Sequence, residues 1–358
     1  MTIDFDRHRW DNVIENADRW WAGRLNRPLI QIRLRGHDAW DHTVFNAIMR
    51  MTAFDPSVSA REIVEKWHED LSNTQYLGDA FPAFWPDFGP GIIAGFLGAK
   101  LDVRPDTVWF LPPADRAIRD VRLEFDPENE WLRRITDIYR AALDRWQGLV
   151  QIGMTDIGGN LDVLATFRPG EKLLLDLYDD PDHVKRLTAD AHNLWWQYFD
   201  LFNDLLQPTN PGYCTWASIF SPKPHYMLQC DFCHMISPDM FDEFVKPELA
   251  KTCRRLENPF YHLDGPGQLR HLDSLLTIEN LKGIQWVPGA GQPDHTHWPE
   301  VYRKIRDAGK LIQLFGTMET LDAVAEQIGT ANGIVLAIDA EFDQHHKAQA
   351  FLEKYRIA

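Results

Sequence analysis

Cysteine is scarce in this chain: only Cys214, Cys230, Cys233 and Cys253 occur among 358 residues. So few cysteines in so long a chain do not form a disulfide framework. The N-terminal stretch alternates charged and aromatic residues and has no apolar signal core. No run of about 18 apolar residues is present to span a membrane. These absences predict a protein of the cytoplasm.

Positive charge is also in short supply. The chain has 37 Lys and Arg against 53 Asp and Glu, a formal net charge of −16, and no basic stretch offsets it. Such a chain repels nucleic acid and anionic membrane surfaces, so we expect neither as a partner. We expect a small-molecule substrate instead. Several of the fourteen tryptophans should pack in the core, and others should line a pocket for an organic ligand.

No low-complexity segment, short repeat or Ser/Gly linker divides the chain, which favours one domain. The first 25 or so residues have the pattern of an amphipathic helix. Residues 29–35 alternate as a strand that places Gln31, Arg33 and Arg35 on one face. A helix is predicted at about 57–76, and the Pro- and Gly-rich segment 81–91 is predicted to be a structured loop.

From residue 149 onward, strands and helices are predicted to alternate. This indicates a parallel sheet with helices outside it. Because no G-x-G-x-x-G follows the first strand, we predict an α/β fold of the (β/α)8 TIM-type barrel class, with an N-terminal helix over 1–25 and the barrel over 26–358. Reactive side chains are then expected at the carboxyl ends of strands. The predicted strands are 149–155, 225–230, 258–264, 283–288, 310–315 and 333–339, and the helices between them 181–206, 237–256, 268–276, 298–308 and 319–329.

The sharpest chemical signal is FYHLDGPG at 260–267. His262 and Asp264 are two residues apart at a strand end, so both side chains point to one face and form half of a metal site. A structural hydrogen bond between the two is the alternative. Glu341, just beyond the last strand, is predicted as a third ligand. A His/Asp/Glu set suits zinc, manganese or ferrous iron.

Weaker candidates lie on other loops. HYMLQCDFCHMISP at 225–238 contains a Cys-x-x-Cys-His pattern, but nothing indicates the export that haem attachment needs. We expect Gln229, Asp231 or Cys230 to face the pocket there. Asp87, between Pro86 and Phe88, is a carboxylate in apolar surroundings that suits acid or substrate-binding work, or else an Asx-turn.

For two further pairs of residues, the sequence is compatible with a purely structural role as well as with a functional one. Arg33 and Arg35 either clamp a substrate carboxylate or form ion pairs at the barrel mouth. His295 and His297 have the spacing of a metal pair, but their place before a helix favours a capping loop.

Several segments together resemble the uroporphyrinogen decarboxylase superfamily over roughly residues 20–355. The most specific is ISPDMFDEFVKPEL. This resemblance implies a barrel with one of two chemistries, and related barrels are often dimers, which makes a homodimer the expectation. The matching segments are NRPLIQIRLRG (26–36), FPAFWPDFGPGIIAGFLGAK (81–100), EKLLLDLYDDPDHVKRL (171–187), ISPDMFDEFVKPEL (236–249) and YHLDGPG (261–267).

The first implied chemistry is zinc-dependent methyl transfer. The family's pattern is a His-x-Cys strand end and a later cysteine, where this chain has His262-x-Asp264 and Glu341. Oxygen ligands in place of sulfur favour a substrate oxygen or nitrogen over a thiol. We therefore expect Zn²⁺ to polarise the heteroatom of a small methoxylated or N-methylated compound. The methyl group would pass to a corrinoid protein, with Asp231 and Gln229 orienting the substrate and Trp286 forming a wall.

The second implied chemistry is decarboxylation of a porphyrinogen. Asp87 matches the family's active-site aspartate, and Arg33 and Arg35 would hold substrate carboxylates. The opening strand lacks the family's full Met-Arg-Gln-Ala-Gly-Arg pattern, and the chain is strongly acidic. A catalytically silent barrel that acts as a binding protein is a third hypothesis, because both family cysteines are replaced.

Overall fold

The computed structural model describes residues 2–36, 51–104 and 107–357. Its central sheet has seven strands in the order β2-β1-β11-β10-β9-β8-β7, and β3-β6 and β4-β5 form separate pairs. Every neighbouring pair in the central sheet is parallel except β1 and β2. The strands are β1 (Leu29–Arg35), β2 (Gln75–Gly78), β3 (Ala83–Phe84), β4 (Lys100–Val103), β5 (Val108–Leu111), β6 (Gln151–Ile152), β7 (His225–Leu228), β8 (Asn258–Asp264), β9 (Gly283–Val287), β10 (Leu311–Leu314) and β11 (Ile334–Glu341).

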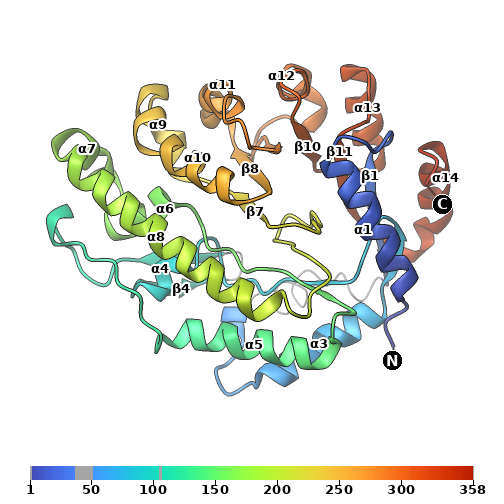
Figure 1. Cartoon of the computed structure of the whole chain (residues 1–358), viewed down its shortest axis with the longest axis horizontal. Helices are drawn as coiled ribbons and strands as arrows, with labels where there is room; N and C mark the ends of the chain where they lie inside the picture. The colour runs from blue at the N-terminus through green and yellow to red at the C-terminus, as the bar shows by residue number, and fades with distance from the viewer. Residues whose placement is uncertain (1, 37–50, 105–106, 358) are drawn as a thin grey trace.

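Helices surround this sheet. Figure 1 shows α9, α11, α12, α13 and α14 following one another around the outside of the curved sheet, with α3 and α5 on the opposite side of the molecule. The helices are α1 (Arg7–Trp21), α3 (Ala60–Ser72), α4 (Ile93–Phe96), α5 (Glu130–Trp146), α6 (Asn160–Phe167), α7 (Glu171–Asp179), α8 (Pro181–Leu206), α9 (Pro238–Phe244), α10 (Lys246–Arg255), α11 (Leu272–Leu276), α12 (Pro299–Asp307), α13 (Met318–Ile328) and α14 (His345–Lys354). Short 3-10 turns are η2 (Met51–Ala53), η3 (Ile118–Asp120), η4 (Asp231–Met235), η5 (Pro266–His271), η6 (His295–His297) and η7 (Phe342–Gln344).

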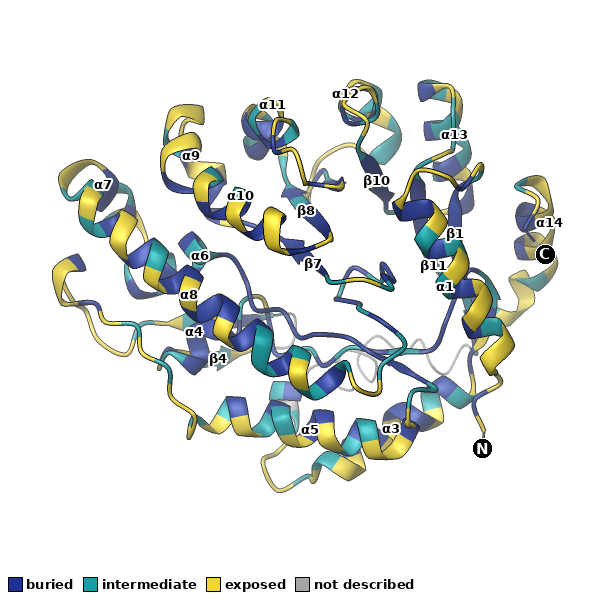
Figure 2. Ribbon diagram, in the orientation of Figure 1, coloured by how far each residue is buried: buried dark blue, intermediate teal, exposed yellow. Residues whose placement is uncertain are grey.

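The N-terminal helix α1 shows how the sequence sets these elements. Asp6 caps it by accepting a hydrogen bond from the Arg9 amide at 2.9 Å. Its buried residues follow a helical spacing, so one stripe faces the protein and the other faces water. Figure 2 shows the same division on the outer helices, with dark buried stripes and yellow exposed ones. None of the described helices is both long and apolar enough to cross a membrane.

A closed eight-stranded barrel is not confirmed. Within the described ranges, β7 and β2 are the edges of the central sheet, and the parallel pair β3-β6 stands apart from it. The segments that carry β3 and β6 contain Pro82, Pro86 and several glycines, and proline has no amide hydrogen to donate to a neighbouring strand. Just after β6, the Met154 amide donates a hydrogen bond to the Cys214 carbonyl at 2.9 Å, which joins the β6 segment to the segment that precedes β7.

The element boundaries agree well with the sequence pattern in the C-terminal half, where α8 and β8 match the predicted ranges. The strand predicted at 149–155 is reduced to the two residues of β6. The helix predicted at 57–76 ends at Ser72, because the chain turns there and enters β2, which pairs antiparallel with β1. The β4-β5 pair and α5 were not among the predicted elements.

A buried ion pair anchors the start of β1. Both Arg27 terminal nitrogens contact the Asp79 carboxylate, at 2.7 and 2.8 Å, and the Ile30 amide donates to it at 3.0 Å. Asp79 is buried. Breaking a charge-assisted hydrogen bond costs more than breaking a neutral one. This carboxylate therefore fixes β1 against β2.

We expect Asp79→Asn to lower the free energy of unfolding by about 2 kcal/mol, because the bidentate charge pairing to Arg27 is lost. Urea denaturation of the variant and the wild type measures the change. Asp102→Asn is the matched control, since Asp102 pairs with Arg104 on the surface and should shift stability by less than about 0.5 kcal/mol. Equal stability of the two variants would contradict this role for Asp79.

Candidate functional site

Two neighbouring parallel strands carry the central residues of the candidate site at their carboxyl ends. Strand β8 ends in His262 and Asp264, and Gly265, with φ of +77°, turns the chain away. Strand β7 ends at Leu228, and Asp231 begins the short turn η4 three residues later. Because β7 and β8 are paired in parallel, the residues that follow these two strands lie at the same end of the sheet.

Asp231, His262 and Asp264 form one compact group. One ligand atom from each side chain lies within 4.8 Å of those of the other two, and no other set of three His, Cys, Asp or Glu side chains in the described residues meets this condition. His262 and Asp264 are half-buried, and Asp231 is exposed. An imidazole nitrogen with two carboxylates is a donor set that suits a borderline or hard divalent cation.

Asp162, in the first turn of α6, holds the η4 turn in place. Its carboxylate accepts hydrogen bonds from the amides of Asp231 at 3.0 Å and Phe232 at 2.8 Å. Gly159 allows this approach, because a Cβ at that position would lie 2.3 Å from the Gln229 carbonyl oxygen. Asp231 is therefore positioned from two directions, by its own strand and by α6.

Carboxylates crowd this end of the sheet. Burial raises the pKa of Asp162, and the nearby Asp231 carboxylate raises it further. Desolvation also raises the pKa of Asp231; the His262 imidazole opposes that rise and Asp264 adds to it. Solvent reaches Asp231, yet protein atoms surround its carboxyl on most sides. Several carboxyl groups thus lie close together at a place where a bound cation would favour their charged forms.

Asp156 extends this cluster inward. It is buried, and it accepts hydrogen bonds from the Gly158 amide at 2.7 Å and from the Gln229 side chain at 3.3 Å. Burial raises its pKa to about 7, opposed by the Gly158 hydrogen bond, while the Asp231 and Asp87 carboxylates add to the rise. Gln229 is itself buried, and its side-chain amide is directed to Asp156.

The His262 ring is held on two sides. Its Nδ1 is hydrogen-bonded to Oε1 of Gln285 on β9, and the Trp216 ring lies edge-on to it, with ring centroids 5.0 Å apart. Trp216 is half-buried, and its indole Nε1 has no hydrogen-bond partner among the described residues. An aromatic side chain that is partly open to solvent beside the imidazole suits a substrate wall.

Glu341 is not part of the group that contains His262 and Asp264, so the predicted ligand set is corrected to Asp231, His262 and Asp264. The sheet order explains the difference. Strands β9 and β10 lie between β8 and β11, and each step across a sheet adds about 4.8 Å. Glu341 instead lies opposite Arg35 in the β1-β11 register.

Arg33 and Arg35 form ion pairs. Arg33 Nε lies 2.7 Å from Asp339 of β11, and Arg35 contacts Asp70 at 3.4 Å and Asp339 at 3.8 Å. Desolvation lowers the pKa of Arg33, but the Asp339 carboxylate outweighs it and the net shift is upward. Their positive charges are therefore largely compensated within the protein.

Trp286 does not line the candidate site, which corrects the predicted substrate wall. It is fully buried and packs against Trp298, with ring centroids 5.1 Å apart. Side chains alternate along a strand, so the inward orientation of Gln285 on β9 turns Trp286 toward the helices. Trp216 is the tryptophan beside His262.

The remaining candidates lie in local turns. Asp87 accepts a hydrogen bond from the Gly89 amide at 2.8 Å, the geometry of the Asx-turn alternative, and it also lies near Asp156. Cys230 and Cys233 are buried as free thiols.

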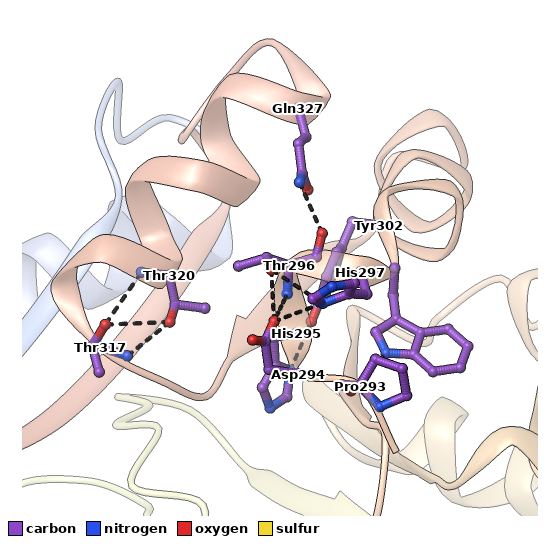
Figure 3. A network of polar contacts seen from close by, with 10 residues as sticks. Pro293, Asp294, His295, Thr296, His297, Tyr302, Thr317, Thr320 and Gln327 are labelled. Atoms are coloured by element: carbon purple, nitrogen blue, oxygen red, sulfur yellow. Dashed lines mark hydrogen bonds and ion pairs between the residues drawn. The ribbon is translucent and has the colours of Figure 1, made fainter.

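The DHTHW segment forms the short turn η6, which Asp294 caps, and Figure 3 shows its polar contacts. The Asp294 carboxylate accepts from the Thr296 amide at 2.9 Å and from His297 Nδ1 at 3.1 Å. His295 Nδ1 is hydrogen-bonded to the Tyr302 hydroxyl at 2.9 Å. The two histidines are thus held by local partners of their own.

Four residues of the site were missed in the sequence: Asp156, Asp162, Trp216 and Gln285. The signal for the first two was present, because TDIGGNLD places carboxylates around a glycine pair directly after a predicted strand. Gln285 stood out as a polar residue within an apolar strand. Trp216 gave no signal, since its segment follows no regular period.

No protein-family model matches this chain, and no curated protein gives a significant match to it.

Proposed function

We propose that this protein is a metal-dependent methyltransferase that resembles the uroporphyrinogen decarboxylase superfamily. It would move a methyl group from a small methoxylated or N-methylated substrate to a corrinoid protein. The observation that carries the proposal is the convergence of Asp231, His262 and Asp264 at the carboxyl ends of β7 and β8. Catalytic residues of (β/α)8 enzymes lie at that end of their strands.

The proposed fold is a barrel of the (β/α)8 type in a single domain. The five parallel steps from β1 through β11 to β7 supply six of its strands. The parallel pair β3-β6 would supply two more. The hydrogen bond from Met154 to Cys214 lies on the side where β6 would approach β7 in such a barrel.

The donor set fits Zn²⁺. Three protein ligands leave a coordination position for a substrate heteroatom, the arrangement of catalytic rather than structural zinc. Zinc supplies Lewis-acid polarisation of the bond between that heteroatom and the methyl carbon. The chain itself orients the ligands: Asp162 positions Asp231, Gln285 positions His262, and Trp216 supplies an apolar wall for the substrate.

The charge of the mouth supports an N-methylated cation over a carboxylate-rich substrate. Asp87, Asp231 and Asp264 lie on this side, and a field of such carboxylates attracts positive ligands. Porphyrinogen decarboxylation is the alternative. It would require Arg33 and Arg35 to hold substrate carboxylates, and both already pair with Asp339.

We also propose that the reaction takes place in the cytoplasm. Four buried free thiols are compatible with the reducing cytoplasm. The methyl acceptor would be a corrinoid bound to a partner protein, and a homodimer remains our expectation by analogy with related barrels.

The test combines metal analysis with methyl transfer. We expect protein purified without chelator and supplemented with Zn²⁺ to hold about one equivalent, as one site of three ligands requires. Methyl transfer to a free Co(I) corrinoid from N-methylated and methoxylated compounds should depend on that metal. Less than about 0.2 equivalents of any divalent metal after supplementation would remove the proposal. Carbon dioxide release from a porphyrinogen would favour the decarboxylase.

A further inference from the structure

Three polar side chains form a row across the central sheet. His262 of β8 is the register partner of Gln285 on β9, and Gln285 is the register partner of Gln313 on β10. The two glutamines are 0% and 1% exposed. A buried amide costs free energy unless all its polar atoms find partners. The row must therefore be joined by hydrogen bonds within the protein.

The direction of these hydrogen bonds is determined at one end. The Ala217 backbone carbonyl can only accept, so Gln313 presents its amide nitrogen there. Its Oε1 is then left to accept from Gln285 Nε2, at 2.5 Å. Gln285 in turn offers only its Oε1 to His262, and that oxygen contacts the Nδ1 atom. In each of these three hydrogen bonds, the donor is the group nearer His262 and the acceptor is the group nearer Ala217. We call this row of hydrogen bonds the relay.

We propose that Gln285 and Gln313 are positioning residues that hold His262 in the tautomer protonated on Nδ1, so that Nε2 is the nitrogen left with a lone pair for a cation shared with Asp231 and Asp264. The proposal rests on the proposed function only in naming a divalent metal as the partner of Nε2. Either nitrogen of a neutral imidazole can carry the proton, and the acceptor decides which one does. Metal-bound histidines commonly donate their other N–H to such a fixed acceptor.

The relay ends at the Ala217 carbonyl, and Ala217 directly follows Trp216 in the sequence. Ser218, with φ of +57°, closes a tight turn in which its amide donates to the Thr215 carbonyl at 3.1 Å. That turn fixes the Ala217 carbonyl. The His262 imidazole is thus held at its Nδ1 by the relay and at its ring by Trp216. Both contacts depend on the same short segment, because Ala217 and Trp216 are adjacent in the sequence.

The first measurement needs neither metal nor activity. Protein labelled with ¹⁵N-histidine and freed of metal is examined at alkaline pH by long-range ¹H–¹⁵N correlation spectra, which distinguish the two tautomers. The His262 signals are identified by their loss in His262→Gln. We expect the Nδ1-protonated pattern in the wild type, and an Nε2-protonated pattern would overturn the proposal.

The second measurement uses variants of the relay. Gln285→Leu removes the acceptor and should give a mixture of tautomers, whereas Gln285→Glu keeps an acceptor oxygen and should retain the Nδ1-protonated form. Zn²⁺ affinity should fall about 10- to 100-fold in Gln285→Leu and less in Gln313→Leu. Gln31→Leu is the control, because Gln31 is a buried glutamine of β1 outside this row.

The outcomes separate the relay from the proposed function. A wild type with the expected tautomer and no measurable Zn²⁺ binding would remove the methyltransferase while leaving the relay supported. An unchanged tautomer in a folded Gln285→Leu would overturn the relay whatever the metal result. Should Gln285→Leu fail to fold, the wild-type spectrum and Gln313→Leu decide, since loss of Gln313 should also weaken the preference for Nδ1.

Discussion

Replacing His262 by alanine is expected to lower the affinity for Zn²⁺ about a thousandfold, which corresponds to about 4 kcal/mol. The imidazole is the one nitrogen donor of the group, and the other two donors are carboxylates that repel each other. Without the histidine, a cation would be held by two acidic side chains on exposed or half-buried positions, an arrangement that is common on protein surfaces and binds weakly. Competition with a chromogenic zinc chelator measures the change.

The matched control for this prediction is Glu341→Ala. Glu341 is also a polar residue at the carboxyl end of a central strand, but β9 and β10 separate it from His262. Its removal should leave the affinity within about twofold of the wild type, while Asp231→Ala and Asp264→Ala should each lower it about a hundredfold. An affinity that falls in Glu341→Ala and stays unchanged in Asp231→Ala would restore the ligand set inferred from the sequence.

The difference between these two ligand sets shows what sequence spacing can establish. His262 and Asp264 are two residues apart in one strand, so their common face follows from strand geometry alone. A third ligand from another strand depends on sheet order and on the path of the connecting loop. Asp231 approaches because Asp162 binds the amides that begin η4, and that contact joins residues 69 apart in the chain.

The fold divides in the same way. The strands β7 to β11 follow clear periodic patterns and lie close to the predicted ranges. The helix predicted at 237–256 is divided into α9 and α10, and the one predicted at 268–276 is the turn η5 followed by α11. The β3 and β6 segments are the exception. Pro82, Pro86 and neighbouring glycines interrupt regular pairing there, so the position of these segments beside the central sheet depends on a few tertiary hydrogen bonds that no local pattern encodes.

Trp286 shows that even a correct strand does not fix which face is functional. Its strand was predicted at 283–288, and β9 spans Gly283–Val287. The polar residue of that strand, Gln285, takes the inner face to reach His262 and Gln313. The neighbouring tryptophan must then face the helices, since adjacent side chains in a strand point to opposite sides.

Asp156 is expected to make the stability of the metal-free protein fall as pH rises. Its pKa in the folded protein is about 7, against an ordinary value of about 4 in the unfolded chain. Below about pH 4 both states hold the proton, and the group costs nothing. Between about pH 4 and 7 the unfolded chain ionises first, so the folded state progressively loses stability, and the full cost is reached above pH 7.

The variant Asp156→Asn should remove this pH dependence. An amide can keep the hydrogen bond from the Gly158 amide, and it carries no charge to be buried beside Asp231 and Asp87. We expect the variant to be more stable than the wild type by about 2 to 4 kcal/mol at pH 8, with the difference vanishing near about pH 4. Urea denaturation across this range in the presence of EDTA measures it, with the exposed Asp11→Asn as control. Parallel pH profiles for wild type and Asp156→Asn would show that Asp156 is ionised at neutral pH, and a negative charge rather than a proton would then face Gln229.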